Sequence, residues 1–145
     1  MVLKIFVDTC ILYDIIGKQE GQVETVLNHC KNKGFQIATS ISTIGEFVNT
    51  AIQSGRDNLI HRLPGFLREY CITVVYPSHY FPETLMTIEG MDASYRLSDS
   101  DKLHLAFAHY GECDFFFTSD KDLRDSNAYE NLVEIGYYGK LRKYL

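Results

Sequence analysis

The sequence predicts an α/β fold, a three-layer sandwich in which helices cover both faces of a central, mostly parallel sheet. Short apolar runs rich in β-branched and aromatic residues alternate along the chain with segments that repeat apolar residues at helical spacing. Strands that alternate with helices in this way form parallel sheets buried on both sides. No internal repeat or linker-like stretch divides the 145 residues, so we expect a single domain over 1–145.

The composition is that of a globular protein, with 46% hydrophobic and 23% charged residues. No apolar run reaches the roughly 18 residues that a membrane helix needs, so no membrane association is expected. Asp8 and Asp14 interrupt the apolar N-terminal segment, which argues against a secretory signal peptide and favours a cytoplasmic protein. The net charge of −5 is atypical of a general nucleic-acid binder, although it does not exclude local basic patches.

The first elements are a strand and two helices. Residues 2–7 form an apolar run, and the apolar residues that follow recur at helical spacing, with Asp8 or Thr9 as the N-cap. Residues 20–33 predict a second helix, which Gly34 closes.

A second strand is expected over 35–39, followed by a helix that Ser40 or Ser42 opens and Gly55 ends. Helical spacing predicts that its core-facing stripe consists of Ile41, Ile44, Val48 and Ile52. The next elements are a helix over 57–70 broken at Pro64-Gly65, a buried strand over 71–76, a loop between Pro77 and Pro82, and a helix over 84–96.

The C-terminal third predicts a strong helix over 101–110, preceded by Ser98 and Ser100 and stopped by Gly111. A strand over 114–118, a turn over 119–125 and a short final strand over 132–135 follow.

The four cysteines, Cys10, Cys30, Cys71 and Cys113, lie far apart and form no CxxC pair, which argues against a zinc ribbon. Cys71 and Cys113 begin apolar runs. They are therefore expected to be small buried hydrophobic residues of a protein in a reducing compartment.

Acidic residues mark the places where a parallel sheet binds ligands, just beyond the carboxyl ends of its strands. Asp8 closes the first strand, Asp120 lies just past the strand over 114–118, and Asp101 begins the helix before that strand. Glu46 lies inside a helix built for packing. Each has an ordinary alternative: Asp8 as an N-cap, Asp101 as a first-turn acid, Asp120 as a turn residue and Glu46 as a surface residue.

Together these acids indicate a metal site. Two carboxylates about 6 Å apart at an effective dielectric constant near 20 repel by about 3 kcal/mol, which a cation between them relieves. Oxygen ligands select Mg²⁺ or Mn²⁺. His104 and His109 fall on different faces of one helix and are interpreted as packing or surface residues rather than as ligands. A carboxylate-held Mg²⁺ activates water and neutralises phosphoryl charge, which points to phosphodiester hydrolysis.

Four segments carry a family resemblance: VDTCILYDI near the N-terminus, STIGEFVN, SDSDKLHLAFA and FTSDKDL. In this order and at these intervals they resemble the PIN-domain nucleases, in particular the small single-domain members typified by VapC toxins. The resemblance covers nearly the whole chain. It implies a compact α/β sandwich with a central parallel sheet, and a set of acids that binds Mg²⁺ or Mn²⁺ and cleaves RNA.

The resemblance also implies roles for individual residues. It makes Asp8, Glu46, Asp101 and Asp120 the catalytic, metal-binding acids, although Asp99 could replace or assist Asp101. Auxiliary roles fall to Thr9, Asp99, Thr118 and Asp122, the Thr118 hydroxyl supporting the metal site. In toxins of this kind an antitoxin covers the acidic crevice, and the chain is expected to form a homodimer.

RNA contacts are expected from the C-terminal basic residues Lys140, Arg142 and Lys143, which lie among tyrosines that could stack on bases. A solvated charge cluster is the alternative. For the whole protein, a catalytically silent PIN-like RNA-binding or scaffold module is the alternative to a nuclease. A haloacid-dehalogenase-like phosphatase is disfavoured because Cys10 stands where its second Asp is required.

Overall fold

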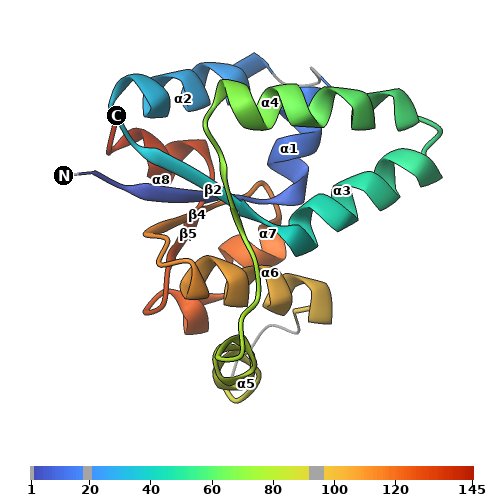
Figure 1. Ribbon diagram of the computed structural model, residues 1–145. Helices are drawn as coiled ribbons and strands as arrows, with labels where there is room; N and C mark the ends of the chain where they lie inside the picture. The colour runs from blue at the N-terminus through green and yellow to red at the C-terminus, as the bar shows by residue number, and fades with distance from the viewer. Residues whose placement is uncertain (1, 18–20, 92–96) are drawn as a thin grey trace.

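A five-stranded sheet of order β3-β2-β1-β4-β5 forms the centre of the computed structural model, which describes residues 2–17, 21–91 and 97–145 (Figure 1). All four strand pairs are parallel, which confirms the α/β class and makes the sheet wholly parallel. The strands are β1 (Lys4–Val7), β2 (Gln36–Ser40), β3 (Thr73–Val75), β4 (Phe115–Phe117) and β5 (Glu134–Gly136).

Helices fill the connections between the strands. The α-helices are α1 (Thr9–Ile16), α2 (Gly21–Asn32), α3 (Ile41–Gln53), α4 (Leu63–Glu69), α5 (Phe81–Glu89), α6 (Asp99–Tyr110), α7 (Lys121–Arg124) and α8 (Tyr138–Arg142). Two 3₁₀ helices, η1 (Asp57–Arg62) and η2 (Asn127–Tyr129), complete the set. No helix in the described parts of the chain is long and apolar enough to span a bilayer.

The apolar side chains form one core on each face of the sheet. Side chains of α1, α2, α3, α4 and α8 pack with Ile5, Val7, Phe115 and Phe117 on one face. On the other face, α5, α6 and α7 pack with Phe6 and Phe116, whose rings stack 5.1 Å apart. Successive residues of β1 thus enter opposite cores, as strand geometry requires. Figure 1 shows α6 against the sheet and α5 outside it.

Local capping explains where two of the early helices begin. Asp8 is the N-cap of α1 and accepts a hydrogen bond from the backbone N–H of Thr9, and Ser40 rather than Ser42 caps α3. Gly34 follows α2 with a φ of +75°, a left-handed conformation that glycine adopts without strain. The predicted start of α2 at Glu20 lies outside the described residues.

The predicted core stripe of α3 is wrong by about one residue. The buried side chains of this helix are Thr43, Phe47 and Ala51. Ile41 and Ile52 are instead exposed, and Ile44 and Val48 are half-buried. Apolar residues occur on both sides of the buried line, so hydrophobic spacing alone did not identify the face that packs.

The middle of the chain differs most from its prediction. The helical segment predicted over 57–70 is divided next to Pro64, because η1 ends at Arg62 and α4 begins at Leu63. Pro64 lies in the first turn of α4, where its missing N–H costs no hydrogen bond. β3 is three residues long at the edge of the sheet, with Thr73 exposed. Cys71, predicted to be buried, is exposed with a φ of +50°. Pro82 lies in the first turn of α5, which starts at Phe81 rather than at residue 84, and the predicted residues 92–96 lie outside the described part.

The C-terminal third follows its prediction with small shifts. Ser98 caps α6, which therefore includes Asp99 and Ser100 in its first turn. Cys113 is buried as expected, and burial raises the pKa of its thiol to about 12, which makes the thiol unreactive. The sequence did not predict α8, a helix of five residues.

Candidate functional site

A cavity of about 400 Å³ opens beside the carboxyl ends of the strands and contains all four acids selected from the sequence. We call it the acidic cavity. Its lining residues are Asp8, Thr9, Cys10, Tyr13, Asp14, Glu46, Thr50, Asp101, Ser119 and Asp120.

The strand order explains why these residues meet. From β1 the chain proceeds to one side of the sheet through β2 and β3, while β4 and β5 lie on the other side. Ligands of open parallel sheets bind where the strand order reverses in this way. Asp8 directly follows β1 and Asp120 follows the adjacent β4, so both lie at this switch point. Glu46 comes from α3 and Asp101 from the first turn of α6.

Asp8 is the most deeply buried of the four acids, with only 5% of its surface exposed. Its Oδ1 accepts a hydrogen bond from the backbone N–H of Thr9 at 2.8 Å, and its Oδ2 accepts one from the Thr118 hydroxyl at 2.8 Å. The backbone N–H of Asp120 donates to the same Thr118 hydroxyl at 3.0 Å. Thr118 therefore connects the first acid to the backbone of the fourth.

Burial gives two of the acids unusual electrostatics. Desolvation raises the pKa of Asp8 above its usual range, and the charge of Glu46 adds a smaller rise. The electrostatic interaction with His104 and hydrogen bonds from Thr118 and Thr9 oppose this rise. Desolvation likewise raises the pKa of Asp101, and the negative charge of Asp120 adds to this rise. The cavity is thus a place where a negative charge is costly unless a positive charge enters it.

Glu46 has the opposite electrostatics. Its burial alone would raise its pKa, but hydrogen bonds from Ser100 and His104 outweigh this and hold the pKa below its usual range. The Ser100 hydroxyl donates to Glu46 Oε2 at 2.6 Å, and His104 Nε2 lies 2.8 Å from the same oxygen. Glu46 is therefore an ionised, anchored carboxylate in the cavity wall.

Two of the acids also have the structural roles that the sequence suggested as alternatives. Asp8 caps α1, and Asp120 caps α7 through Oδ1, which accepts from the backbone N–H groups of Asp122 and Leu123. These bonds fix the direction of both side chains. A capping role and a place in the cavity are therefore compatible.

The donor chemistry of the cavity suits a hard divalent cation. Its acids offer oxygen ligands, and the buried Thr9 hydroxyl adds a polar oxygen to the wall beside Glu46, whose pKa it helps to lower. Such a hydroxyl can bind a water molecule of a hydrated ion. The acids do not form a closed cage: within 2–17, 21–91 and 97–145, no three Asp, Glu, His or Cys side chains are arranged to hold a metal ion.

The auxiliary residues fall into two groups. Thr9 lines the acidic cavity, and Thr118 bonds to Asp8 just behind its wall. Asp99 and Asp122 are exposed in the first turns of α6 and α7 and are not among the lining residues. The structure thus brings Asp101 rather than Asp99 into the cavity.

Sequence reasoning missed part of the wall. Cys10, Tyr13 and Asp14 lie at spacings of three and four residues on α1 and line the cavity together. This polar stripe was visible in the sequence beside the apolar residues Ile11 and Leu12. His104, interpreted as a packing or surface residue, is buried but bonds to Glu46, whereas His109 is exposed.

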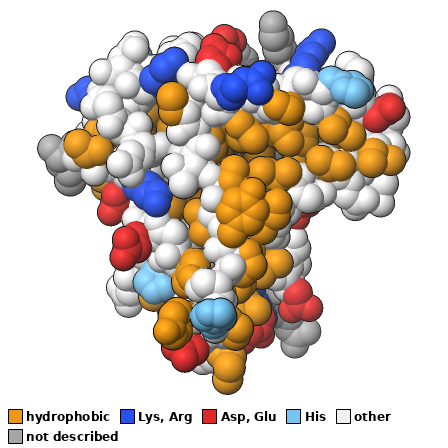
Figure 2. All heavy atoms as spheres, in the orientation of Figure 1, with side chains coloured by type: hydrophobic (Ala, Val, Ile, Leu, Met, Phe, Trp, Pro, Cys, Tyr) orange, Lys and Arg blue, Asp and Glu red, His pale blue; other side chains and the backbone are white. Residues whose placement is uncertain are grey.

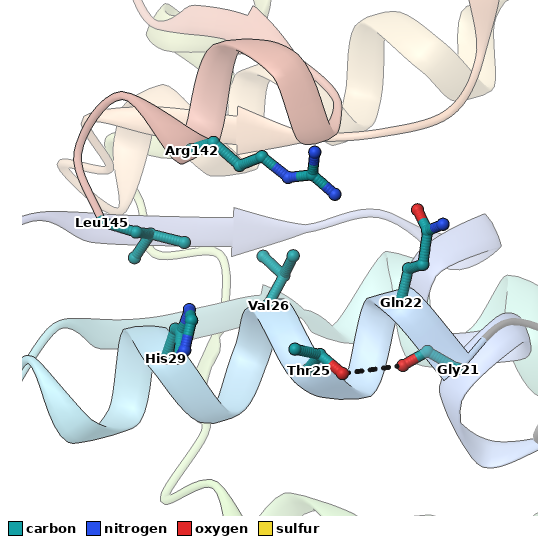
Figure 3. A pocket seen from close by; sticks show the side chains of 7 residues that line it. All are labelled: Gly21, Gln22, Thr25, Val26, His29, Arg142 and Leu145. Atoms are coloured by element: carbon teal, nitrogen blue, oxygen red, sulfur yellow. Dashed lines mark hydrogen bonds between the residues drawn. The ribbon is translucent and has the colours of Figure 1, made fainter.

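The C-terminal basic residues lie apart from the acids. Lys140 pairs with Glu130 at 3.1 Å, and Lys143 pairs with Glu134 at 2.7 Å. Arg142 lines a separate cavity of about 650 Å³ and approaches α2 from the opposite wall, as Figure 3 shows. That cavity contains no residue of the acidic cavity, so RNA contacts by these three residues stay a prediction.

Comparison with known proteins agrees with this architecture. A family model described as "PIN domain" matches residues 5–128. No curated protein matches the sequence.

Three solved structures resemble the fold. VapBC2 from Rickettsia felis, bound to a promoter DNA fragment, is 15% identical with a TM-score of 0.72, covering 93% of this chain and 98% of that one. A toxin-antitoxin complex from Klebsiella pneumoniae is 18% identical with a TM-score of 0.60, covering 90% and 94%. VapC20 from Mycobacterium tuberculosis, a toxin that cleaves the sarcin-ricin loop, is 14% identical with a TM-score of 0.64, covering 90% and 97%. At these identities the likeness shows the fold.

Proposed function

Because the chain belongs to the PIN domain family, we propose that it is a metal-dependent ribonuclease whose acidic cavity holds Mg²⁺ or Mn²⁺. Asp8, Glu46, Asp101 and Asp120 would be the ligands, directly or through water. When bound, the metal would supply an acidified water as nucleophile and would neutralise charge on the scissile phosphate. The single observation that carries this proposal is the meeting of these four acids, from four separate segments, in one cavity at the switch point of the sheet.

The chain's own residues have defined tasks in this proposal. Asp8 is held on both oxygens and presents a fixed charge at the floor of the cavity. Glu46 is held ionised by Ser100 and His104, so it is ready to bind a cation without first losing a proton. The negative charge of Asp120 disfavours ionisation of Asp101, and a cation bound between the two carboxylates would relieve this repulsion.

The first prediction is direct. Purified protein should cleave a single-stranded RNA oligonucleotide when Mn²⁺ is present and stop when a chelator removes the metal. The exposed Asp57 provides a matched control, since Asp57→Asn removes one carboxylate that does not line the cavity and should cleave like the wild type. Cleavage that persists at full rate in excess chelator would contradict the proposal.

A catalytically silent module is the second candidate function, and the same protein sample distinguishes it. Such a module could bind RNA without cutting it and need not bind Mn²⁺. Calorimetric titration with Mn²⁺ that shows no binding, together with intact RNA after prolonged incubation, would favour the silent module.

The likeness to toxin-antitoxin complexes supports a further part of the proposal, namely that the chain is a toxin held inactive by an antitoxin. An antitoxin segment would cover the acidic cavity, with an Arg or Lys paired to its carboxylates. We predict that expression of the chain alone arrests growth of a bacterial host and that co-expression of the adjacent upstream reading frame restores growth. Normal growth without that reading frame would count against the toxin assignment.

We also propose a homodimer. Large apolar side chains remain exposed on α3, after β3 and on α5: Ile41, Ile52, Tyr76, Tyr80 and Met86. Figure 2 shows apolar side chains gathered over the middle of the face that carries β3. Contiguous exposed apolar surface of this kind marks interaction sites. A mass by light scattering twice that of one chain supports the dimer, and a monomer mass at micromolar concentration contradicts it.

A cytoplasmic location stays a prediction from the sequence.

A further inference from the structure

His104 is buried within α6, with 1% of its surface exposed, and both of its ring nitrogens face polar side chains. Nε2 lies 2.8 Å from Glu46 Oε2, and Nδ1 lies 3.3 Å from the hydroxyl of Thr43 and 3.5 Å from that of Ser42. A buried imidazole with a partner at each nitrogen is held in one orientation. From the sequence alone His104 was interpreted as a packing or surface residue, and the proposed function uses it only as a hydrogen-bond partner of Glu46.

The partners determine which way the hydrogen bonds run. A carboxylate only accepts, so Nε2 carries the hydrogen and donates it to Glu46. The Thr43 hydroxyl then donates to Nδ1, while it accepts from the Ser40 hydroxyl at 3.0 Å. Ser40 in turn accepts from the backbone N–H of Thr43 as the N-cap of α3. The hydrogen bonds therefore run in one direction from the beginning of α3 through His104 to Glu46.

Glu46 has more need of such support than the other three acids. Its side chain is the longest of the four and is 41% exposed, so it has the most rotamer freedom to lose when it binds a ligand. The backbone N–H of Thr9 and the hydroxyl of Thr118 hold Asp8, and the α7 backbone holds Asp120. For Glu46 the corresponding bonds come from His104 and Ser100, both on a different helix, α6.

We propose that His104 is the positioning residue for Glu46: oriented by the Thr43 hydroxyl, its Nε2–H fixes Oε2 so that Oε1 meets the metal ion in the acidic cavity. This inference rests on the proposed nuclease function. Groups that orient a metal ligand typically change metal affinity or activity 10–100-fold when they are lost.

Two amide substitutions separate this role from simple packing. In His104→Gln the side-chain N–H falls near the position of Nε2 and can still donate to Glu46. In His104→Asn the side-chain N–H lies near the position of Nδ1 and cannot reach Glu46. Titration with Mn²⁺ alone, followed by electron paramagnetic resonance, should show roughly 10–100-fold weaker binding for His104→Asn and binding within about threefold of the wild type for His104→Gln. With RNA, kcat should fall in the Asn variant while KM stays unchanged.

The exposed His109 on the same helix provides the matched control, and His109→Gln should bind Mn²⁺ like the wild type. If His104→Asn does not fold, the double variant Ser42→Ala/Thr43→Val replaces it, because it removes both hydroxyls that lie within 3.5 Å of Nδ1. That variant should also lose Mn²⁺ affinity. Equal Mn²⁺ affinity in the wild type and in the Asn variant, or equal losses in the Asn and Gln variants, would overturn the positioning role.

A metal-free measurement keeps this inference separate from the nuclease proposal. Long-range ¹H–¹⁵N spectra of the wild type report which ring nitrogen of His104 carries the hydrogen. We expect the Nε2–H form, and an Nδ1–H tautomer would overturn the inference even if the protein cleaves RNA. Failure of the wild type to bind Mn²⁺ would instead overturn the proposed function, and the spectrum would still decide the contact with Glu46.

Discussion

The variant Asp8→Asn should lose RNA cleavage by more than about 100-fold, since even the loss of a group that only supports a metal ligand costs 10–100-fold. The amide keeps the shape of the side chain and the oxygen that caps α1, but it removes the charge that a cation needs. The hydroxyl of Thr118, which donates to Asp8 Oδ2 in the wild type, can rotate to accept from the new N–H group. The fold should therefore survive.

The stability of the same variant tests the physical reason. Burial raises the folded-state pKa of Asp8, so ionisation of this carboxyl is harder in the folded than in the unfolded chain. The resulting destabilisation is absent below the unfolded-state pKa and grows as the pH rises through the folded-state pKa. Above that pKa, Asp8→Asn should unfold at a higher temperature than the metal-free wild type. A variant that cleaves RNA at the wild-type rate with Mn²⁺ would show that Asp8 is not a metal-binding acid.

Mn²⁺ should stabilise the wild type against thermal unfolding. A ligand that binds only the folded chain at 100 times its Kd adds about 2.7 kcal/mol to the free energy of unfolding. For a chain of this size that corresponds to roughly 5–10 °C in Tm. The effect should be large because the cation relieves the desolvated and mutually repelling charges of the acidic cavity.

The control variants make this thermal shift specific. Asp57→Asn should gain as much from Mn²⁺ as the wild type, because its carboxylate is exposed outside the cavity. Asp8→Asn should gain little. An equal gain in Asp8→Asn and the wild type would place the bound metal somewhere other than the acidic cavity.

The parallel sheet and the meeting of the four acids could be predicted from the sequence because both follow from chain order. Alternating strands and helices force parallel pairing, and parallel strands bring their carboxyl ends to one edge. Asp8 and Asp120 lie at this edge because each follows the carboxyl end of its strand in the sequence. Asp101 was chosen over Asp99 from the resemblance, and the structure places Asp101 in the cavity.

Other features depend on tertiary packing that local patterns do not encode. The buried line of α3 runs through Thr43 and Phe47 because α6 and the sheet pack there, although Ile41 and Ile52 are more hydrophobic than Thr43. Pro82 lies in the first turn of α5, whereas the sequence placed it at the end of a loop, because proline suits both a first turn and a loop. The bond between His104 and Glu46 spans 58 residues, and spacing within one helix could not reveal it.

Anomalous diffraction from a crystal of the wild-type protein soaked in Mn²⁺ shows whether the acidic cavity binds a hard divalent cation. We expect one or two manganese peaks in the cavity, with Asp8 and at least one of Glu46, Asp101 and Asp120 at ligand distance, roughly 2.0–2.3 Å. A cavity without manganese at a saturating concentration, or manganese bound only at other surfaces, would contradict this expectation.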